Sequence, residues 1–189
     1  MRFQKFHLKA TFMNRVEQFE REKYQAIWGR GDYTSTTAIN YAQSLVGKVG
    51  GYVLEIGCGR GVSLDILNKD GCCKCTGVDI TLVGCRSDAP VFEAAAWNLP
   101  FPDKSFDYSF STDTLEHIPP ECIEATLKEI DRVTRNKTFH QIALVKAVTE
   151  YQGSQVHLTV EPGEWWDDQF KAFCNIEAEL IYWGTFNYA

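Results

Sequence analysis

The feature that most constrains the fold of this chain is a short apolar run, followed by a glycine-rich turn and then by a helical pattern. Residues 52–56 (YVLEI) are typical of a buried strand, 57–61 (GCGRG) of a tight turn, and 62–67 of a helix. Glycine adopts positive φ readily and lets a ligand approach the backbone closely. In open α/β sheets, ligands bind at the carboxyl ends of the strands, where this turn would lie. The segment therefore predicts a ligand site in an α/β domain.

Strand and helix patterns alternate along the rest of the chain. Pro119 and Pro120 open an expected helix that continues through Ile130, and a later helix is expected over 164–173. This alternation is typical of an α/β fold, a Rossmann-like, doubly wound and mostly parallel sheet with helices on both faces. Further strands are expected over 75–79, 91–96, 106–110, 139–148 and 178–186.

The first 48 residues have a helical pattern instead. Apolar residues from Met13 to Ile27 lie near helical spacing, and the segment 29–32 breaks this helix. A second helix is expected from Ser35 or Thr36 to Gly47. We therefore expect a single domain over 1–189, with a helical cap over 1–48 and an α/β core over 49–189.

Composition limits the class of protein. The chain has 189 residues, enough for one domain with a substantial core, and 44% of them are hydrophobic. No apolar run is long enough to cross a bilayer, and no apolar segment follows the early basic residues. We expect a cytoplasmic protein without a signal peptide. The net charge of −6 disfavours a broad nucleic-acid surface.

Cysteine usage indicates reduced thiols. The seven cysteines are an odd number without the regular spacing of a disulfide framework. Cys72, Cys73 and Cys75 lack a second pair at zinc-finger spacing and lie where a buried strand should begin. We interpret them as small buried hydrophobic residues and predict no metal site.

The spacing of the glycine turn separates classes of nucleotide-binding protein. Val62 stands where a dinucleotide-binding turn needs glycine or alanine, and no phosphate-binding Gly-Lys-Ser/Thr follows. Residues 55–61 (EIGCGRG) resemble the first motif of the class I S-adenosylmethionine-dependent methyltransferases. The resemblance implies that this turn, with Gly57, Cys58, Gly59 and Gly61, lies under the methionine part of the cofactor. Glu55 would orient the turn or accept a hydrogen bond from the ammonium group.

An acid ends the second expected strand. Asp79 follows Gly57 by 22 residues, a distance that matches this family. The resemblance implies that its carboxylate accepts hydrogen bonds from both ribose hydroxyls and that Ile80 packs on the adenine. The alternative is an aspartate that begins a turn.

A longer match lies downstream. Residues 98–107 (NLPFPDKSFD) and 108–117 (YSFSTDTLEH) resemble a run common in the family's small-molecule branch. By this resemblance, Ser111 and Thr112 face the transferred methyl group. Ala95 stands where relatives often carry an aspartate, so backbone at Ala96 and Trp97 would contact the adenine. The chain also departs from the family by ending early, so we expect a shortened carboxyl-terminal strand region in which the family's last antiparallel strand is missing or replaced.

Methyl transfer from a sulfonium needs positioning and loss of a proton from the acceptor, and it requires no metal. His117 is the first candidate for a catalytic base and His157 the second, on the loop after the fifth strand. A histidine that only packs is the alternative for both. Tyr24, Trp28 and Tyr33 would form a lid with an aromatic face for the sulfonium, or pack as an ordinary helix.

The leading hypothesis is an S-adenosylmethionine-dependent methyltransferase that releases S-adenosylhomocysteine. Its expected partner is a small-molecule, sugar or lipid-like acceptor, with neither membrane nor nucleic acid; the oligomeric state is open. One alternative is a regulatory or scaffold protein that binds the cofactor without chemistry. A nicotinamide-dependent oxidoreductase is disfavoured by Val62 and by the run over 99–117.

Overall fold

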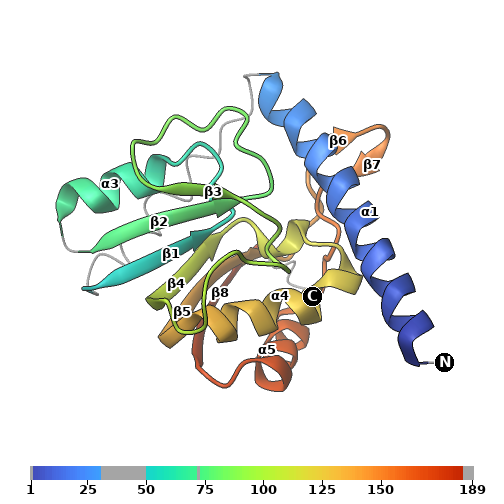
Figure 1. The fold of residues 1–189 in the computed structure, drawn as a ribbon. Coiled ribbons are helices and arrows are strands. Elements are labelled where there is room, and N and C mark those ends of the chain that lie inside the picture. The colour runs from blue at the N-terminus through green and yellow to red at the C-terminus, as the bar shows by residue number, and fades with distance from the viewer. Residues whose placement is uncertain (1, 31–49, 72, 185–189) are drawn as a thin grey trace, which may run out of the picture.

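A computed structural model describes residues 2–30, 50–71 and 73–184, with the side chains of the first helix described from Met13 onward. The second helix expected before Gly47 lies outside these residues. The elements, shown in Figure 1, are α1 (Arg2–Gly29), β1 (Tyr52–Ile56), α3 (Val62–Asp70), β2 (Lys74–Asp79), β3 (Val91–Glu93), β4 (Phe106–Thr112), the 3-10 helix η1 (Leu115–His117), α4 (Pro120–Val133), β5 (Thr134–Ala143), β6 (Glu150–Tyr151), β7 (Ser154–Gln155), α5 (Gly163–Phe173) and β8 (Glu177–Trp183).

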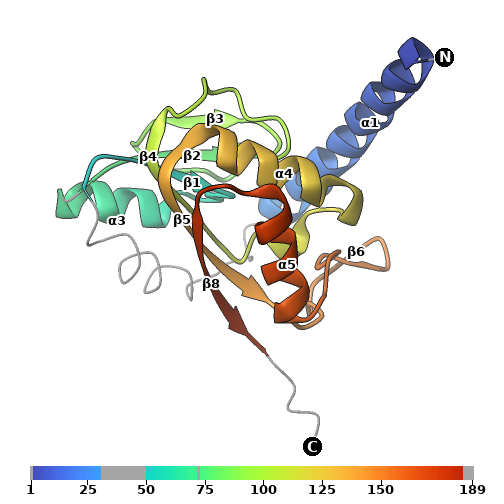
Figure 2. The same ribbon diagram turned by 90° about the horizontal axis from the view of Figure 1, so that it is seen from below.

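The strands form a six-stranded sheet in the order β3-β2-β1-β4-β5-β8. Every neighbouring pair in this order is parallel. Helix α3 covers one face, and α4 and α5 cover the other (Figures 1 and 2). This arrangement confirms the predicted Rossmann-like, parallel α/β fold.

Two apolar cores lie on opposite faces of the sheet because successive strand residues point to opposite sides. On one face, Val53 packs with Leu64 and Leu67 of α3. On the other, Leu54 packs with Ile123 and Leu127 of α4. Burial on both faces explains why β1 is almost continuously apolar.

The order of the strands reverses at β1. The chain runs outward from β1 to β2 and β3, then returns to place β4 on the other side of β1. Ligands of open α/β sheets bind at such a switch point, beyond the carboxyl ends of the strands. The glycine turn follows β1 at this place.

The largest differences from the sequence prediction are in two strands, β3 and β5. Strand β3 ends at Glu93, before the expected Ala96, because the backbone enters a turn in which Asn98 N bonds to Ala95 O. Strand β5 covers Thr134–Ala143 instead of 139–148. Its first half looks too polar for a buried strand, yet Thr134 and Thr138 are fully buried and hydrogen-bond with Ser109.

A small antiparallel hairpin, β6–β7, was not expected from the sequence. Phe19 of α1 contacts Tyr151 of this hairpin edge to face, with ring centroids 6.4 Å apart. Figure 1 shows α1 running past the hairpin along one edge of the domain. Among the described residues, no helix has the length and apolar character required to cross a membrane.

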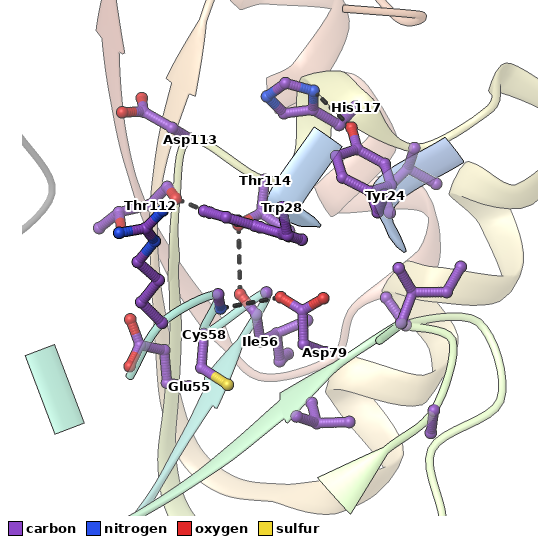
Figure 3. Close-up of a pocket in the computed structure, with 18 of the residues that line it drawn as sticks. Tyr24, Trp28, Glu55, Ile56, Cys58, Asp79, Thr112, Asp113, Thr114 and His117 are labelled. Atoms are coloured by element: carbon purple, nitrogen blue, oxygen red, sulfur yellow. Dashed lines mark hydrogen bonds between the residues drawn. The ribbon is translucent and has the colours of Figure 1, made fainter. Parts of the chain in front are cut away.

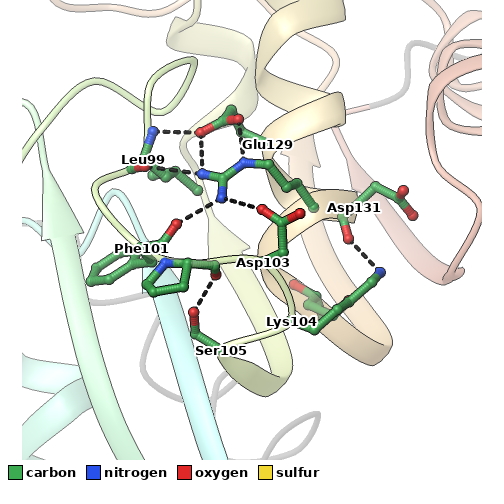
Figure 4. A network of polar contacts seen from close by, with 10 residues as sticks. Leu99, Phe101, Asp103, Lys104, Ser105, Glu129 and Asp131 are labelled. Carbon is green, nitrogen blue, oxygen red and sulfur yellow. Dashed lines mark hydrogen bonds and ion pairs between the residues drawn. The ribbon is translucent and has the colours of Figure 1, made fainter.

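The run over 98–107 is held in place by Arg132 at the end of α4 (Figure 4). Its guanidinium donates to the carbonyl oxygens of Phe101 at 2.7 Å and Leu99 at 3.0 Å. It also pairs with the carboxylates of Glu129 and Asp103. These bonds fix the loop between β3 and β4, so part of the most specific sequence match has a structural role.

Candidate functional site

A cavity of about 320 Å³ opens at the carboxyl ends of β1, β2 and β4, and α1 supplies its outer wall. Its size is in the usual range for small-molecule sites. Ten of the candidate site residues line it: Glu55, Gly57, Cys58, Gly59, Asp79, Ile80, Ala96, Trp97, Thr112 and His117. The structure therefore brings these ten residues together around one cavity, and their role in cofactor binding stays a prediction.

The glycine turn has the backbone conformation that its sequence implies. Gly57 has φ 74° and Gly59 has φ 51°, both in the left-handed region. The amides of Gly57 and Cys58 donate to Val78 O at 2.8 and 3.1 Å, which ties the turn to the end of β2. A Cβ atom on Gly57 would lie 2.4 Å from the side chain of Thr114. Glycine is needed here for both conformation and space.

Glu55 is buried on the cavity wall with 2% of its surface exposed. One carboxyl oxygen, Oε1, accepts a hydrogen bond from Ser63 Oγ at 2.5 Å. The other, Oε2, has no hydrogen-bonding partner within the described residues. Burial raises the pKa of this carboxyl to about 8. An unpartnered acceptor beside the glycine turn fits a ligand that brings a cationic donor, as an ammonium group does.

Asp79 ends β2 and faces the same cavity. Its Oδ2 accepts from Gly59 N at 2.8 Å, and its Oδ1 accepts from Thr81 N at 3.3 Å. Burial raises the pKa of Asp79 to about 6, although both backbone bonds oppose that rise. The carboxylate therefore braces the turn, and each oxygen retains acceptor capacity for a ligand hydroxyl.

The wall beyond Asp79 is apolar. Ile80, Ala96 and Trp97 line it together with Ala94 and Ile118. The indole nitrogen of Trp97 is buried and has no hydrogen-bonding partner in the part of the chain described. This combination of apolar surface with a single donor suits a flat heteroaromatic ring.

Three candidate residues do not line the cavity: Ser111, Gly61 and His157. Ser111 does not face the cavity: it is fully buried, and its hydroxyl bonds with Nδ1 of His140 at 2.7 Å. Neighbouring residues of a strand point to opposite faces, so Thr112 lines the cavity and Ser111 does not. Gly61 caps α3 with φ 77°, and a Cβ there would lie 2.4 Å from Ser87. Its role in the described structure is to turn the chain.

The two candidate bases stand next to each other. His117 lines the cavity, and its Nδ1 lies 3.0 Å from Val156 O and 2.8 Å from the Tyr24 hydroxyl. The ring of His157 meets it edge to face, with centroids 4.6 Å apart, but His157 does not line the cavity. Burial, aided by His157, lowers the pKa of His117 to about 3. His117 is therefore neutral around neutral pH.

Helix α1 contributes Glu20, Tyr24 and Trp28 to the cavity. Figure 3 shows Trp28 among the labelled residues of the cavity wall, and a Cβ atom on Gly59 of the glycine turn would lie 3.0 Å from its ring. The Arg60 guanidinium lies 5.8 Å from the Trp28 ring centre. The sequence pointed to Tyr24 and Trp28 and missed Glu20. Glu20, Tyr24 and Trp28 follow one another at intervals of four residues, which places them on one helix face. This spacing could have identified Glu20 as a cavity residue.

Comparison with known proteins finds a family match for the middle part of the chain. Residues 54–140 match the family described as methyltransferase domain. An uncharacterised protein of Methanocaldococcus jannaschii is 37% identical over 95 residues, which are 47% of this chain and 35% of that protein. The chain thus spans about a third of this curated relative.

Two solved structures are also similar. The [4+2]-cyclase SpnF shares 19% identity with a TM-score of 0.55, over 71% of this chain and 54% of SpnF. An S-adenosylmethionine-dependent methyltransferase from Archaeoglobus fulgidus shares 27% identity with a TM-score of 0.43, over 62% and 50%. The cyclase match shows the shared fold.

The matched residues include β1 with its glycine turn, β2 with Asp79, and the run that ends at His117. Residues 54–140 are therefore a class I S-adenosylmethionine-dependent methyltransferase domain. The cofactor of this class is S-adenosylmethionine.

Proposed function

We propose that the protein transfers a methyl group from S-adenosylmethionine to a small-molecule, sugar or lipid-like acceptor. The observation that carries the proposal is the unpartnered oxygen of Glu55, buried beside the glycine turn of a methyltransferase domain. A buried acceptor without a donor is costly, so it points to a ligand that supplies one.

The walls of the cavity suit successive parts of the cofactor. Glu55 and the glycine turn would hold the amino-acid part, and Asp79 the ribose hydroxyls. Ile80, Ala96 and Trp97 would contain the adenine. The sulfonium would then lie near Thr112, with the acceptor between it and α1. In this proposal all of residues 1–189 act as one unit, with α1 as its cap.

S-adenosylmethionine supplies an activated methyl group, so the protein's contribution is to align donor and acceptor and to exclude water. Trp28 and Tyr24 give this part of the cavity aromatic walls, which suit a sulfonium cation. A His117 imidazole with a pKa of about 3 is a weak proton acceptor. His117 is therefore proposed as a positioning residue, and His157 as its support.

Calorimetric titration with S-adenosylhomocysteine tests the cofactor site. The wild type should bind with micromolar affinity, and Glu55→Gln should bind at least about tenfold more weakly because an amide, unlike a carboxyl group, cannot ionise to pair with the ammonium group. Exposed Glu177→Gln, which lies outside the cavity, is the matched control and should bind as the wild type does. A folded wild type that does not bind would overturn the proposal.

A second candidate function is cofactor binding without methyl transfer. The low pKa of His117, about 3, favours it, because such an imidazole accepts a proton from an acceptor only weakly. The fold alone does not decide between methyl transfer and cofactor binding without it, because the cyclase SpnF has a similar fold. Release of S-adenosylhomocysteine in the presence of a panel of hydroxyl, amine and thiol acceptors distinguishes the two. Binding without release across the panel would favour the second function.

A further inference from the structure

Three side chains with metal-binding chemistry meet at the end of the cavity. The ligand atoms of Glu116, His117 and His157 all lie within 4.8 Å of one another. Two residues come from η1, after β4, and the third comes from the loop that follows β7. The fold therefore assembles this cluster from segments about forty residues apart in sequence.

Hydrogen bonds fix the tautomers of both histidines. Nδ1 of His157 lies 2.6 Å from Val145 O, and Nδ1 of His117 lies 3.0 Å from Val156 O. A carbonyl oxygen only accepts, so in each ring Nδ1 carries the proton and donates it. The Tyr24 oxygen, 2.8 Å from Nδ1 of His117, shares that proton. Nε2 of each neutral ring is then a lone-pair donor for a metal, as in many metal sites.

Glu116 supplies the third side chain of the cluster, a buried carboxyl group. It has no exposed surface, and its Oε1 accepts from Ala143 N at 3.0 Å. Its Oε2 has no hydrogen-bonding partner among the described residues. A buried carboxyl oxygen without a partner costs about 1–3 kcal/mol unless a ligand supplies the missing contact. A cation in the cluster would supply it.

We propose that Glu116, His117 and His157 bind a divalent transition-metal ion of the Zn²⁺ or Mn²⁺ type. Two imidazoles and one carboxylate suit such ions and leave coordination positions open for water or substrate. Ligand atoms bound to one ion lie roughly 3–3.5 Å apart, so the most widely separated ligand atoms would move up to about 1.5 Å closer together on binding.

The metal has a role in the reaction if the proposed methyl transfer holds, and this part of the inference rests on that function. Of the three ligands, His117 lines the cavity, so an open position on the ion would face the acceptor. A hydroxyl oxygen bound there would have a lowered pKa and would lose its proton to water. The new O–CH₃ bond would form as the S–CH₃ bond breaks, releasing S-adenosylhomocysteine. The acceptor class is then an alcohol or a phenol.

Titration of the metal-free full chain with Co²⁺ tests the site, because the visible spectrum of Co²⁺ reports its ligands. The wild type should bind one Co²⁺ with a spectrum that Zn²⁺ removes. His157→Ala and Glu116→Gln should each weaken Co²⁺ binding at least about tenfold. Gln at position 116 can still accept from Ala143 N, and His157 is only partly buried, so both variants should fold, which thermal unfolding checks.

The matched control is Cys73→Ser. The Cys73 and Cys75 sulfurs lie 3.3 Å apart and form another group in the described chain that could attract Co²⁺ or Zn²⁺. This variant should bind as the wild type does. The proposal is overturned by a folded wild type without a Co²⁺ spectrum, by unchanged binding in His157→Ala, or by loss of binding in Cys73→Ser.

Cofactor binding is measured separately, so the two proposals fail in different ways. His157→Ala should retain S-adenosylhomocysteine binding, and Glu55→Gln should retain Co²⁺ binding. Co²⁺ binding by a wild type that does not bind S-adenosylhomocysteine would overturn the proposed function and leave the metal site standing. The reverse result would overturn the metal site alone.

Discussion

The indole ring of Trp28 lies directly over Gly59, close enough that a Cβ atom on this glycine would lie 3.0 Å from the ring. The first helix of the chain thus packs against the turn that follows the first strand. This contact sets the distance between the cap and the glycine turn. It also makes the cavity sensitive to a single added methyl group.

Gly59→Ala is expected to weaken S-adenosylhomocysteine binding about tenfold or more. The methyl group would push on Trp28, and the positive φ would strain the backbone by about 1 kcal/mol. Gly71→Ala is the matched control, since Gly71 also has a positive φ but nothing lies within 4 Å of its Cβ position. Both variants should lose similar stability in urea unfolding, and only Gly59→Ala should lose binding. Equal binding by the two variants would contradict the role of this contact.

Arg132→Met is expected to lower the free energy of unfolding by about 2 kcal/mol. The change leaves the carbonyl oxygens of Leu99 and Phe101 without their donor and separates the loop from α4. Arg135→Met removes only an exposed ion pair with Asp107 and should cost under about 1 kcal/mol. Urea unfolding measures both. Similar losses for the two variants would show that the network in Figure 4 does not hold the loop.

Glu55 is expected to make stability depend on pH. Its pKa is about 8 in the folded chain, against 4.5 as the reference value. Between these values the unfolded state is ionised and the folded state is protonated, so folding takes up a proton. Stability is then complete at lower pH and falls by about 1.4 kcal/mol per pH unit up to the folded pKa.

Urea unfolding between about pH 5 and about pH 8 measures this slope. Glu55→Gln cannot ionise and should have a smaller slope than the wild type. Asp79 and Glu116 also have raised pKa values and contribute to the slope of both proteins. The difference between the two proteins isolates Glu55, and identical slopes would mean that this carboxyl is ionised in the folded state.

The ion pair between Lys23 and Glu20 on α1 is buried, with about 4–5% of each side chain exposed. Lys23→Met should destabilise the protein by about 3 kcal/mol, because it leaves a buried carboxyl without its cation. The double variant Glu20→Met with Lys23→Met should lose less, since no charge remains to be buried. Lys128→Met, which breaks an exposed pair with Glu124, should cost about 0.5 kcal/mol.

Urea unfolding of these variants measures the buried pair. A double variant less stable than Lys23→Met would contradict this interpretation and indicate a direct packing role for both side chains.

The sequence predicted the parallel fold because its signals are local: β1 is apolar throughout, and glycine turns or prolines mark where α3 and α4 begin. It also placed Glu55, Gly57, Gly59 and Asp79 on one cavity wall, since the carboxyl ends of parallel strands meet. The predicted position of β5 was wrong because the sequence pattern cannot show that the buried hydroxyl groups of Thr134 and Thr138 both hydrogen-bond with Ser109.

The residues that the sequence missed depend on contacts distant along the chain. The sequence left open whether Glu116 has a local structural role or acts in the site. Only the folded structure shows that Ala143 N donates to one of its oxygens and that the other has no hydrogen-bonding partner among the described residues. The meeting of His157 with His117 depends in the same way on the path of the chain after β7. The prediction of no metal site considered cysteines, whose clustering is visible in sequence, and not these histidines.

A helix from the start of the chain closes a cavity whose other walls are built by residues 55–118. A molecule held there touches both, so its binding and the docking of α1 share one equilibrium. Whatever fills the cavity should slow amide hydrogen exchange along Glu20–Trp28, and whatever loosens this helix should shorten the residence time of the occupant. The rate at which product leaves would then be set by the undocking of a helix, with the sheet beneath it unchanged.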